Sequence, residues 1–367
     1  WGFECEGQEG QEGQKGQKGQ ACTLEGWHMI RQFMRWVWGE RHLPLLPLLP
    51  LLPLLPFSTI AAQDPLPGAE KRIPAQPGFR VYVLVDMEGM GSAVKSQEVI
   101  AGNEGPAYRE RTGPDYWTHY REMLTEEANA AIRGARAGGA QAFVVNEGHG
   151  GNRFANLLPW ALDQEAILIR GYPRPMVMST GIDSTFGTMM MLAMHASWGK
   201  PGVMSHNYAF ADFRVNGTFL NEVGINALVA GEQGVSVSLV SGDDELMKEV
   251  REILGDRVVT VTVKTALGGA AAITHSPTAV RRMLEEGARE AVRRERAGEL
   301  VPFTLAKPYR VEFTLRPTYP DSLVAGVDNL APVWGMEKTG PRTYRFVTSD
   351  AKQIAYLLDA IELVVLP

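Results

Sequence analysis

The sequence predicts an α/β fold: a mixed or mostly parallel sheet with helices on both faces, plus a smaller C-terminal α+β portion. From residue 79 onward, strand-like apolar runs alternate with helical runs, which is typical of a sheet covered by helices. After Pro302 the pattern changes to two strand-like runs and a closing helix. The 367 residues, 45% of them hydrophobic, are enough for one large or two modest domains with a sizeable core.

The elements are predicted in order from their periodicity and their end signals. The expected strands of the α/β part are RVYVLVD (80–86), AQAFVVNE (140–147), TMMMLAMHA (188–196), VSVSLVSGDD (235–244) and RVVTVTV (257–263). The expected helices lie at 121–137, 221–233, 243–254 and 276–297. Gly138 and Gly139 end the first helix, and Ser276 with Pro277 opens the last. The C-terminal portion contains YRVEFTLR (309–316), RTYRFVTSD (342–350) and a helix at 351–363.

The N-terminal part differs in composition from the rest of the chain. Residues 1–28 form a low-complexity leader that contains the repeat EGQEGQEGQKGQKGQ, which we expect to be disordered or not natural. Residues 29–62 have the order of a signal peptide: basic residues, the apolar run LPLLPLLPLLPLLPF, and a small-residue cleavage site near Ala61 or Ala62. We predict a linker at 63–78, an α/β domain at 79–301 and the α+β portion at 302–367, packed on it.

The leader bears on where the protein acts. We expect export to the periplasm or the medium, or a cytoplasmic protein if the leader is not natural. The alternatives to a signal peptide are a proline-rich linker and a membrane anchor. The apolar run is shorter than the ~20 residues of a spanning helix and is interrupted by prolines, which argues against the anchor. We therefore expect no membrane span in the mature chain. Both cysteines, Cys5 and Cys22, precede residue 63. The mature chain would therefore contain no cysteine, and a metal in it would be held by His, Asp and Glu.

The charge balance excludes one class of partner. The formal net charge is −6 and the sequence pI is near 5.8, so the chain has no basic footprint for nucleic acid. We expect no nucleic-acid partner.

Two carboxylates, Asp86 and Glu88, follow the apolar run VYVLV beside a glycine. If the strand continues through them, both side chains point to one side, because side chains alternate faces along a strand. Two carboxylates so close repel each other and need a cation or strong donors to stay ionised. The pair alone is weak support for a metal.

Three further side chains lie where an α/β fold builds its site. In open α/β sheets ligands bind beyond the carboxyl ends of the strands. His149 follows one predicted strand, His195 follows another, and Glu222 begins a predicted helix. With Asp86 and Glu88 they make five potential ligands, enough for two four-coordinate ions if one carboxylate and a water or hydroxide bridge them.

His206, in GVMSHNYAF, lies just past this set and is a candidate for proton transfer or oxyanion stabilisation. Each residue also has a structural interpretation. Asp86 could cap a turn, Glu222 could favour its helix N-terminus through the dipole, and the histidines could be hydrogen-bonded core residues. His119 and His275 have no comparable setting, and we expect them at the surface.

The motifs LVDMEG, MLTEEAN, NEGHGG, MHA, PGVMSHN and NEVGINA, in this order, resemble the D-aminopeptidase family typified by DppA, peptidase family M55. The resemblance covers about residues 80–275. It implies a dinuclear zinc enzyme, with two Zn²⁺ per chain, that releases D-amino acids from the N-termini of short peptides and assembles as a ring-shaped homo-oligomer. It also implies that Asp86 bridges the ions and that His206 is catalytic. The remaining ligands of the two ions would be Glu88, His149, His195 and Glu222.

Two features depart from the family pattern. Glu147 stands in NEGHGG where relatives often have aspartate, and the segment 101–120 is longer and more aromatic than a minimal connection. Loops line sites of this kind, so these departures bear on substrate preference. We predict a zinc aminopeptidase that acts through a metal-bound hydroxide. The alternatives are a related metal-dependent hydrolase on another amide, with phosphoester cleavage ranked low, and a non-catalytic exported peptide- or metal-binding protein.

Overall fold

The computed structural model describes residues 73–100 and 116–365 and contains two sheets. The first sheet has seven strands. Its strand order is β3-β2-β1-β4-β7-β8-β9. The strands are β1 (Arg80–Val85), β2 (Ala142–Glu147), β3 (Ala166–Ile169), β4 (Thr188–Met194), β7 (Val237–Asp243), β8 (Val259–Gly268) and β9 (Ala271–Thr274). All neighbours pair in parallel except β8 and β9. The predicted α/β class with a mostly parallel sheet is confirmed.

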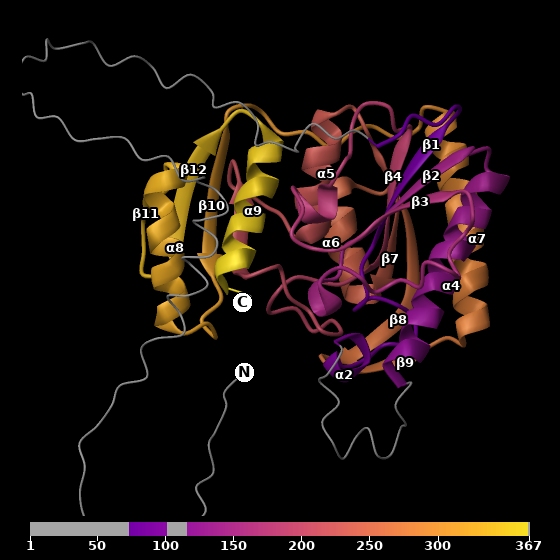
Figure 1. The fold of residues 1–367 in the computed structure, drawn as a ribbon, viewed down its shortest axis with the longest axis horizontal. Coiled ribbons are helices and arrows are strands. Elements are labelled where there is room, and N and C mark those ends of the chain that lie inside the picture. The colour runs from indigo at the N-terminus through magenta and orange to yellow at the C-terminus, as the bar shows by residue number, and fades with distance from the viewer. Residues whose placement is uncertain (1–72, 101–115, 366–367) are drawn as a thin grey trace, which may run out of the picture. The chain divides into compact units, whose positions relative to one another are not determined.

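Helices cover both faces of this sheet because β1 is apolar on both. Val81 and Val83 pack in a cluster with residues of α4 (Tyr116–Ala137) and α7 (Pro277–Arg296). Tyr82 and Leu84 pack in the opposite cluster with α5 (Glu222–Glu232) and α6 (Asp244–Leu254). Figure 1 shows the two helix pairs on either side of the sheet. Continuous apolar strands of this kind are typical of parallel sheets buried on both faces.

A second, antiparallel sheet has the order β11-β12-β10-β5-β6. Its strands are β5 (Phe210–Val215), β6 (Thr218–Phe219), β10 (Tyr309–Leu315), β11 (Glu337–Lys338) and β12 (Thr343–Thr348), accompanied by α8 (Asp321–Trp334) and α9 (Ala351–Val365). The strands β10, β12 and helix α9 lie where the sequence predicts them. However, β5 and β6 come from the chain between β4 and α5, so the predicted boundary at 301/302 does not separate the two sheets.

Three short elements complete the described chain: α2 (Ser96–Val99) and the 3₁₀ turns η1 (Gly150–Asn152) and η2 (Val177–Ser179). None of the described helices is long and apolar enough to cross a membrane. The predicted leader (1–28), the signal peptide (29–62), most of the linker and the segment 101–115 lie outside the described residues. The predictions made for them stay predictions.

Candidate metal centre

The turn after β1 holds the first two predicted ligands. Asp86 and Glu88 do not occupy alternate strand positions as expected, because β1 ends at Val85. The turn is instead fastened to the end of β4: Asp86 N donates to Leu192 O at 2.9 Å and Gly89 N donates to Ala193 O at 2.7 Å. Both carboxylates are buried, and they converge because the turn brings them together.

Gly89 makes this close approach possible. A Cβ at this position would lie 1.8 Å from the carbonyl oxygen of Met194, which no side chain could tolerate. The glycine beside the carboxylate pair is thus required by the packing of the turn on β4.

His149 follows β2 and faces the two carboxylates. Its Nε2 lies 2.7 Å from the carbonyl oxygen of Val99. Its Nδ1 lies 2.9 Å from Glu88 Oε2 and 3.5 Å from Asp86 Oδ1. The backbone carbonyl thus binds one ring nitrogen, and the other ring nitrogen points at the acids.

His195 follows β4 and faces the other side of Asp86. Its Nδ1 lies 3.0 Å from the carbonyl oxygen of Ala196. Its Nε2 lies 3.4 Å from Asp86 Oδ2 and 3.6 Å from Glu222 Oε2. Asp86 therefore stands between the two buried histidines, with one oxygen toward each.

Glu222 is the first residue of α5, and local bonds hold it in place. Asn221 caps the helix, since its side chain accepts from Gly224 N at 2.9 Å. The second carboxylate oxygen of Glu222 accepts from Tyr208 N at 2.6 Å. The cap and this bond direct the carboxylate toward His195 rather than toward its own helix.

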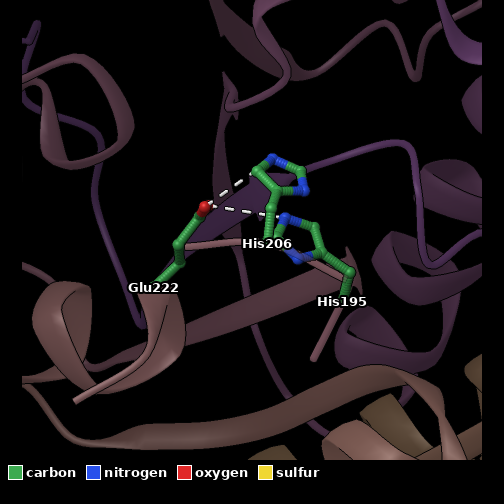
Figure 2. Close-up of side chains that lie close together, drawn as sticks. All are labelled: His195, His206 and Glu222. Atoms are coloured by element: carbon green, nitrogen blue, oxygen red, sulfur yellow. Dashed lines mark ion pairs between the residues drawn. The ribbon is translucent and has the colours of Figure 1, made fainter. Parts of the chain in front are cut away.

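His206 lies beside His195 (Figure 2). The two rings are stacked, with centroids 3.9 Å apart and planes inclined by 12°. His206 Nδ1 lies 2.9 Å from the carbonyl oxygen of Met204, and Nε2 lies 3.9 Å from Glu222 Oε1. Its side chain is 28% exposed, whereas those of His149 and His195 are at most 6% exposed. Of these three histidines, His206 is therefore the most exposed to solvent.

The hydrogen bonds of the three rings indicate a cation site. A nitrogen that faces a backbone carbonyl must carry the ring proton, so in the neutral ring the other nitrogen has a free lone pair. In each case that second nitrogen faces carboxylate oxygens, which are also acceptors. Asp86 Oδ2 and Glu88 Oε2 are buried and form no hydrogen bond, although ring nitrogens lie near both. Acceptors that face one another in a buried site need a cation between them.

The ligand atoms fall into two groups whose members lie within 4.8 Å of one another: Asp86, Glu88 and His149, and His195, His206 and Glu222. These nitrogen and carboxylate donors suit zinc. All six predicted site residues are thus brought together, and the residues present fit a metal pair. His119 and His275 are exposed, as expected.

The pKa values show how strongly these groups depend on one another. Burial, followed by the charge of Glu88, raises the pKa of Asp86 to about 7. Burial lowers the pKa of His149, but the carboxylates of Glu88 and Asp86 outweigh it and raise that pKa to about 10. Burial and the charge of His195 lower the pKa of His206. The acids need positive charge beside them, which a divalent cation would supply in place of protonated histidine.

Two supporting carboxylates lie behind the ligands. Glu249 on α6 accepts from Ser197 N at 2.9 Å and from Asn221 Nδ2 at 3.0 Å, so it joins the loop after His195 to the cap of α5. Glu147, where the sequence departs from the family pattern, accepts from Asn156 N and Leu157 N and binds the loop after η1. Burial raises the pKa of Glu147 to about 7.

Lys264 was not among the predicted site residues. It lies on β8 and donates to backbone carbonyls of the turn that carries Glu88. Burial lowers the pKa of its ammonium group to about 8. The signal in the sequence is a lysine within the otherwise apolar run VTVKTAL, and only the fold shows which segment it meets.

Comparison with known proteins finds a family model, a similar sequence and a similar solved structure. The sequence model of the D-aminopeptidase family, peptidase M55, matches residues 79–360. A D-aminopeptidase of Bacillus subtilis (strain 168) is 34% identical over 210 residues, which are 57% of this chain and 72% of the relative. A solved structure, described as the Zn-dependent D-aminopeptidase DppA from Bacillus subtilis, a self-compartmentalizing protease, matches with a TM-score of 0.67 and 30% identity. The match covers 79% of this chain and 99% of that one.

Proposed function

The chain belongs to the D-aminopeptidase family M55 and is a metallo-aminopeptidase, and we propose on this premise that it releases N-terminal D-amino acids from short peptides at a centre of two zinc ions. One observation carries the proposal. Asp86 places one oxygen toward His149 and the other toward His195, at 3.5 and 3.4 Å. A carboxylate with its two oxygens directed at two ligand groups is suited to bridging two ions.

The remaining ligands divide between the two sides of Asp86. Glu88 and His149 would hold one ion, and His195 and Glu222 the other. When bound, zinc supplies a water activated for attack and a Lewis acid that polarises the scissile carbonyl. Three carboxylates against two divalent cations leave a net positive charge, which favours an anionic oxygen during hydrolysis.

His206 is the residue to which we assign proton transfer. Its Nδ1 is bound to the Met204 carbonyl, so Nε2 has the free lone pair and lies on the side of Glu222. From there it can take a proton from the attacking water and return it to the amine that leaves. Its partial exposure gives peptide access that the fully buried histidines lack.

Assembly and location form a second part of the proposal. The similar solved structure is described as self-compartmentalizing, which supports a ring-shaped homo-oligomer for this chain. Light scattering of the purified protein tests it, and a monomer would withdraw it. We also infer export from the basic, apolar and small-residue order of residues 29–62. A mature N-terminus near residue 63 on protein recovered outside the cytoplasm would support export.

The function is tested by product release from matched dipeptides that differ only in the configuration of the N-terminal residue. The purified chain, loaded with zinc, is expected to cleave the D-aminoacyl peptide and to leave the L-aminoacyl peptide largely intact. Cleavage of the L peptide alone would keep the metal mechanism and remove the D-specific assignment. Tight binding of both peptides without product after long incubation would favour a binding protein.

A further inference from the structure

Lys264 is a buried cation that binds backbone rather than an acid. Its residue is 1% exposed. Its Nζ lies 2.6 Å from Glu88 O, 3.0 Å from Met90 O and 2.5 Å from Ala93 O. Three carbonyl acceptors match the three donors of an ammonium group. Among the residues that the structure describes, no carboxylate lies within ion-pair distance of it.

A buried ammonium without an ion pair is costly, so it is retained only where its hydrogen bonds matter. Here they bring three carbonyls of one short turn toward a single point. A loop cannot direct three carbonyls inward unless a donor meets them. The conformation of residues 88–93 therefore depends on Lys264.

Two other elements bind the same turn from different sides. Glu127 on α4 accepts from Gly91 N at 3.0 Å. Gly89 N donates to the end of β4, at Ala193 O. The turn is thus held by β4 and α4 through its N–H groups and by β8 through its carbonyls. Of these contacts, only those of Lys264 include the backbone of Glu88.

We propose that Lys264 is a positioning residue that fixes Glu88 in the metal centre. The proposal rests on the metal centre described above and assigns it a support on β8. Its effect is selective. Asp86 has its own bond to Leu192 O. His195 follows β4 and Glu222 begins α5, and Lys264 makes no hydrogen bond with either element. Loss of Lys264 should therefore weaken the ion held by Glu88 and His149 and leave the other.

The test is metal binding by the full chain carrying Lys264→Met, a variant of similar length without the donors. Zinc per chain and its dissociation constants are measured by competition with a chromogenic chelator, and the visible spectrum is recorded after loading with Co²⁺. We expect the unchanged protein to hold two ions. Lys264→Met should keep one with unchanged affinity and bind the second about 10- to 100-fold more weakly, with a changed Co²⁺ spectrum.

Activity provides a second readout. Turnover of Lys264→Met should recover as zinc is raised, because the weakened site refills. The same zinc requirement in a variant that is merely less stable would show instead that zinc acts by stabilising the fold. Lys264→Gln keeps two amide donors, so its affinity for the second ion should lie between those of the unchanged protein and Lys264→Met. If circular dichroism shows that Lys264→Met does not fold, Lys264→Gln alone is compared with the unchanged protein. Val311→Ala, a buried truncation on β10 in the other sheet, is the control for lost stability.

The outcomes separate this inference from the proposed function. Two ions bound with unchanged affinities and an unchanged Co²⁺ spectrum in the Lys264 variants would overturn the positioning role and leave the function standing. Equal weakening of both ions, or the same weakening in Val311→Ala, would also overturn it. An unchanged protein that takes up no metal would overturn both proposals.

Discussion

The rings of His195 and His206 are stacked with their centroids 3.9 Å apart, although the first is buried among carboxylates and the second is partly open to solvent. Both present a nitrogen toward Glu222, at 3.6 Å for His195 and 3.9 Å for His206. Figure 2 shows the two approaches converging on one carboxylate. The same geometry allows His206 either to transfer protons beside the ions or to act as a further ligand, and one substitution distinguishes the two roles.

Replacing His206 by alanine is expected to leave two zinc ions per chain and to lower kcat by about 10²- to 10⁴-fold, the usual contribution of a positioned acid or base. Metal analysis and steady-state kinetics check it. His119→Ala is the matched control, because that side chain is 78% exposed on α4. Loss of an ion in the His206 variant would make it a ligand, and equal turnover would remove it from the mechanism.

Removing the metal with a chelator should abolish peptide cleavage and lower the melting temperature. Without cations, the buried carboxylates of Asp86, Glu88 and Glu222 repel one another and depend on the neighbouring histidines to compensate their charge. Zinc added back should restore both properties at two equivalents. Restoration complete at one equivalent would argue against a metal pair, and activity that survives exhaustive chelation would argue against metal catalysis.

Gly89→Ala should destabilise the protein by about 2–3 kcal/mol, the upper range for an overpacked site, and should weaken metal binding. The added methyl group meets the Met194 carbonyl, so the turn that carries Glu88 must move away from β4. Denaturant unfolding and zinc titration measure the two effects. Gly269→Ala is the control, since nothing lies within 4 Å of a Cβ there. Equal stability of the two variants would contradict the packing described.

The cap of α5 should matter for catalysis as well as for folding. Asn221→Ala removes a helix cap worth about 1 kcal/mol and the bond to Glu249, so Glu222 should lose its direction and zinc affinity should fall. Ser276→Ala removes the cap of α7 and should cost a similar stability without changing metal affinity. If both variants bind zinc equally well, the cap does not position Glu222.

Stability should fall as the pH rises from about 4 to 8, in part because of α9. Burial raises the pKa of Asp359 to about 8. The backbone N–H groups of Met176 and Val177 and the charge of Arg174 act to lower this pKa, but burial outweighs them. Burial also raises the pKa of Glu362 to about 8. A carboxyl group with a raised pKa keeps its proton in the folded state after the unfolded chain has lost it. Folding is therefore favoured at low pH and loses that support as the pH approaches 8.

Asp359→Asn should accordingly gain stability relative to the unchanged protein as the pH rises, by roughly 2 kcal/mol at pH 8, given about 1.4 kcal/mol per pKa unit and partial exposure of the site. Urea unfolding at pH 4, 6 and 8 measures the difference. Asp256→Asn, at an exposed position after α6, is the control for replacing an aspartate by asparagine. A difference for Asp359→Asn that stays constant with pH would show that its carboxyl is ionised in the fold.

The sequence by itself was sufficient for the α/β class and for the order of the main strands and helices. Local periodicity and end signals report on neighbours along the chain, which is why β1, β2, β4 and α5 appear where they are predicted. The six site residues could be proposed for the same reason: each follows a strand, lies in a loop or begins a helix. A parallel sheet collects such positions at one edge.

Only the tertiary structure decided how those residues meet. The expected alternation of Asp86 and Glu88 along a strand was wrong, because the chain turns at Asp86 to bind β4. The pairing of β5 with β10 and the contact of Lys264 with the Glu88 turn join segments about 100 and 170 residues apart. The hydrogen bond between His149 and the Val99 carbonyl likewise joins segments 50 residues apart. Such long-range contacts are selected by packing of the whole chain, and local residue patterns carry no record of them.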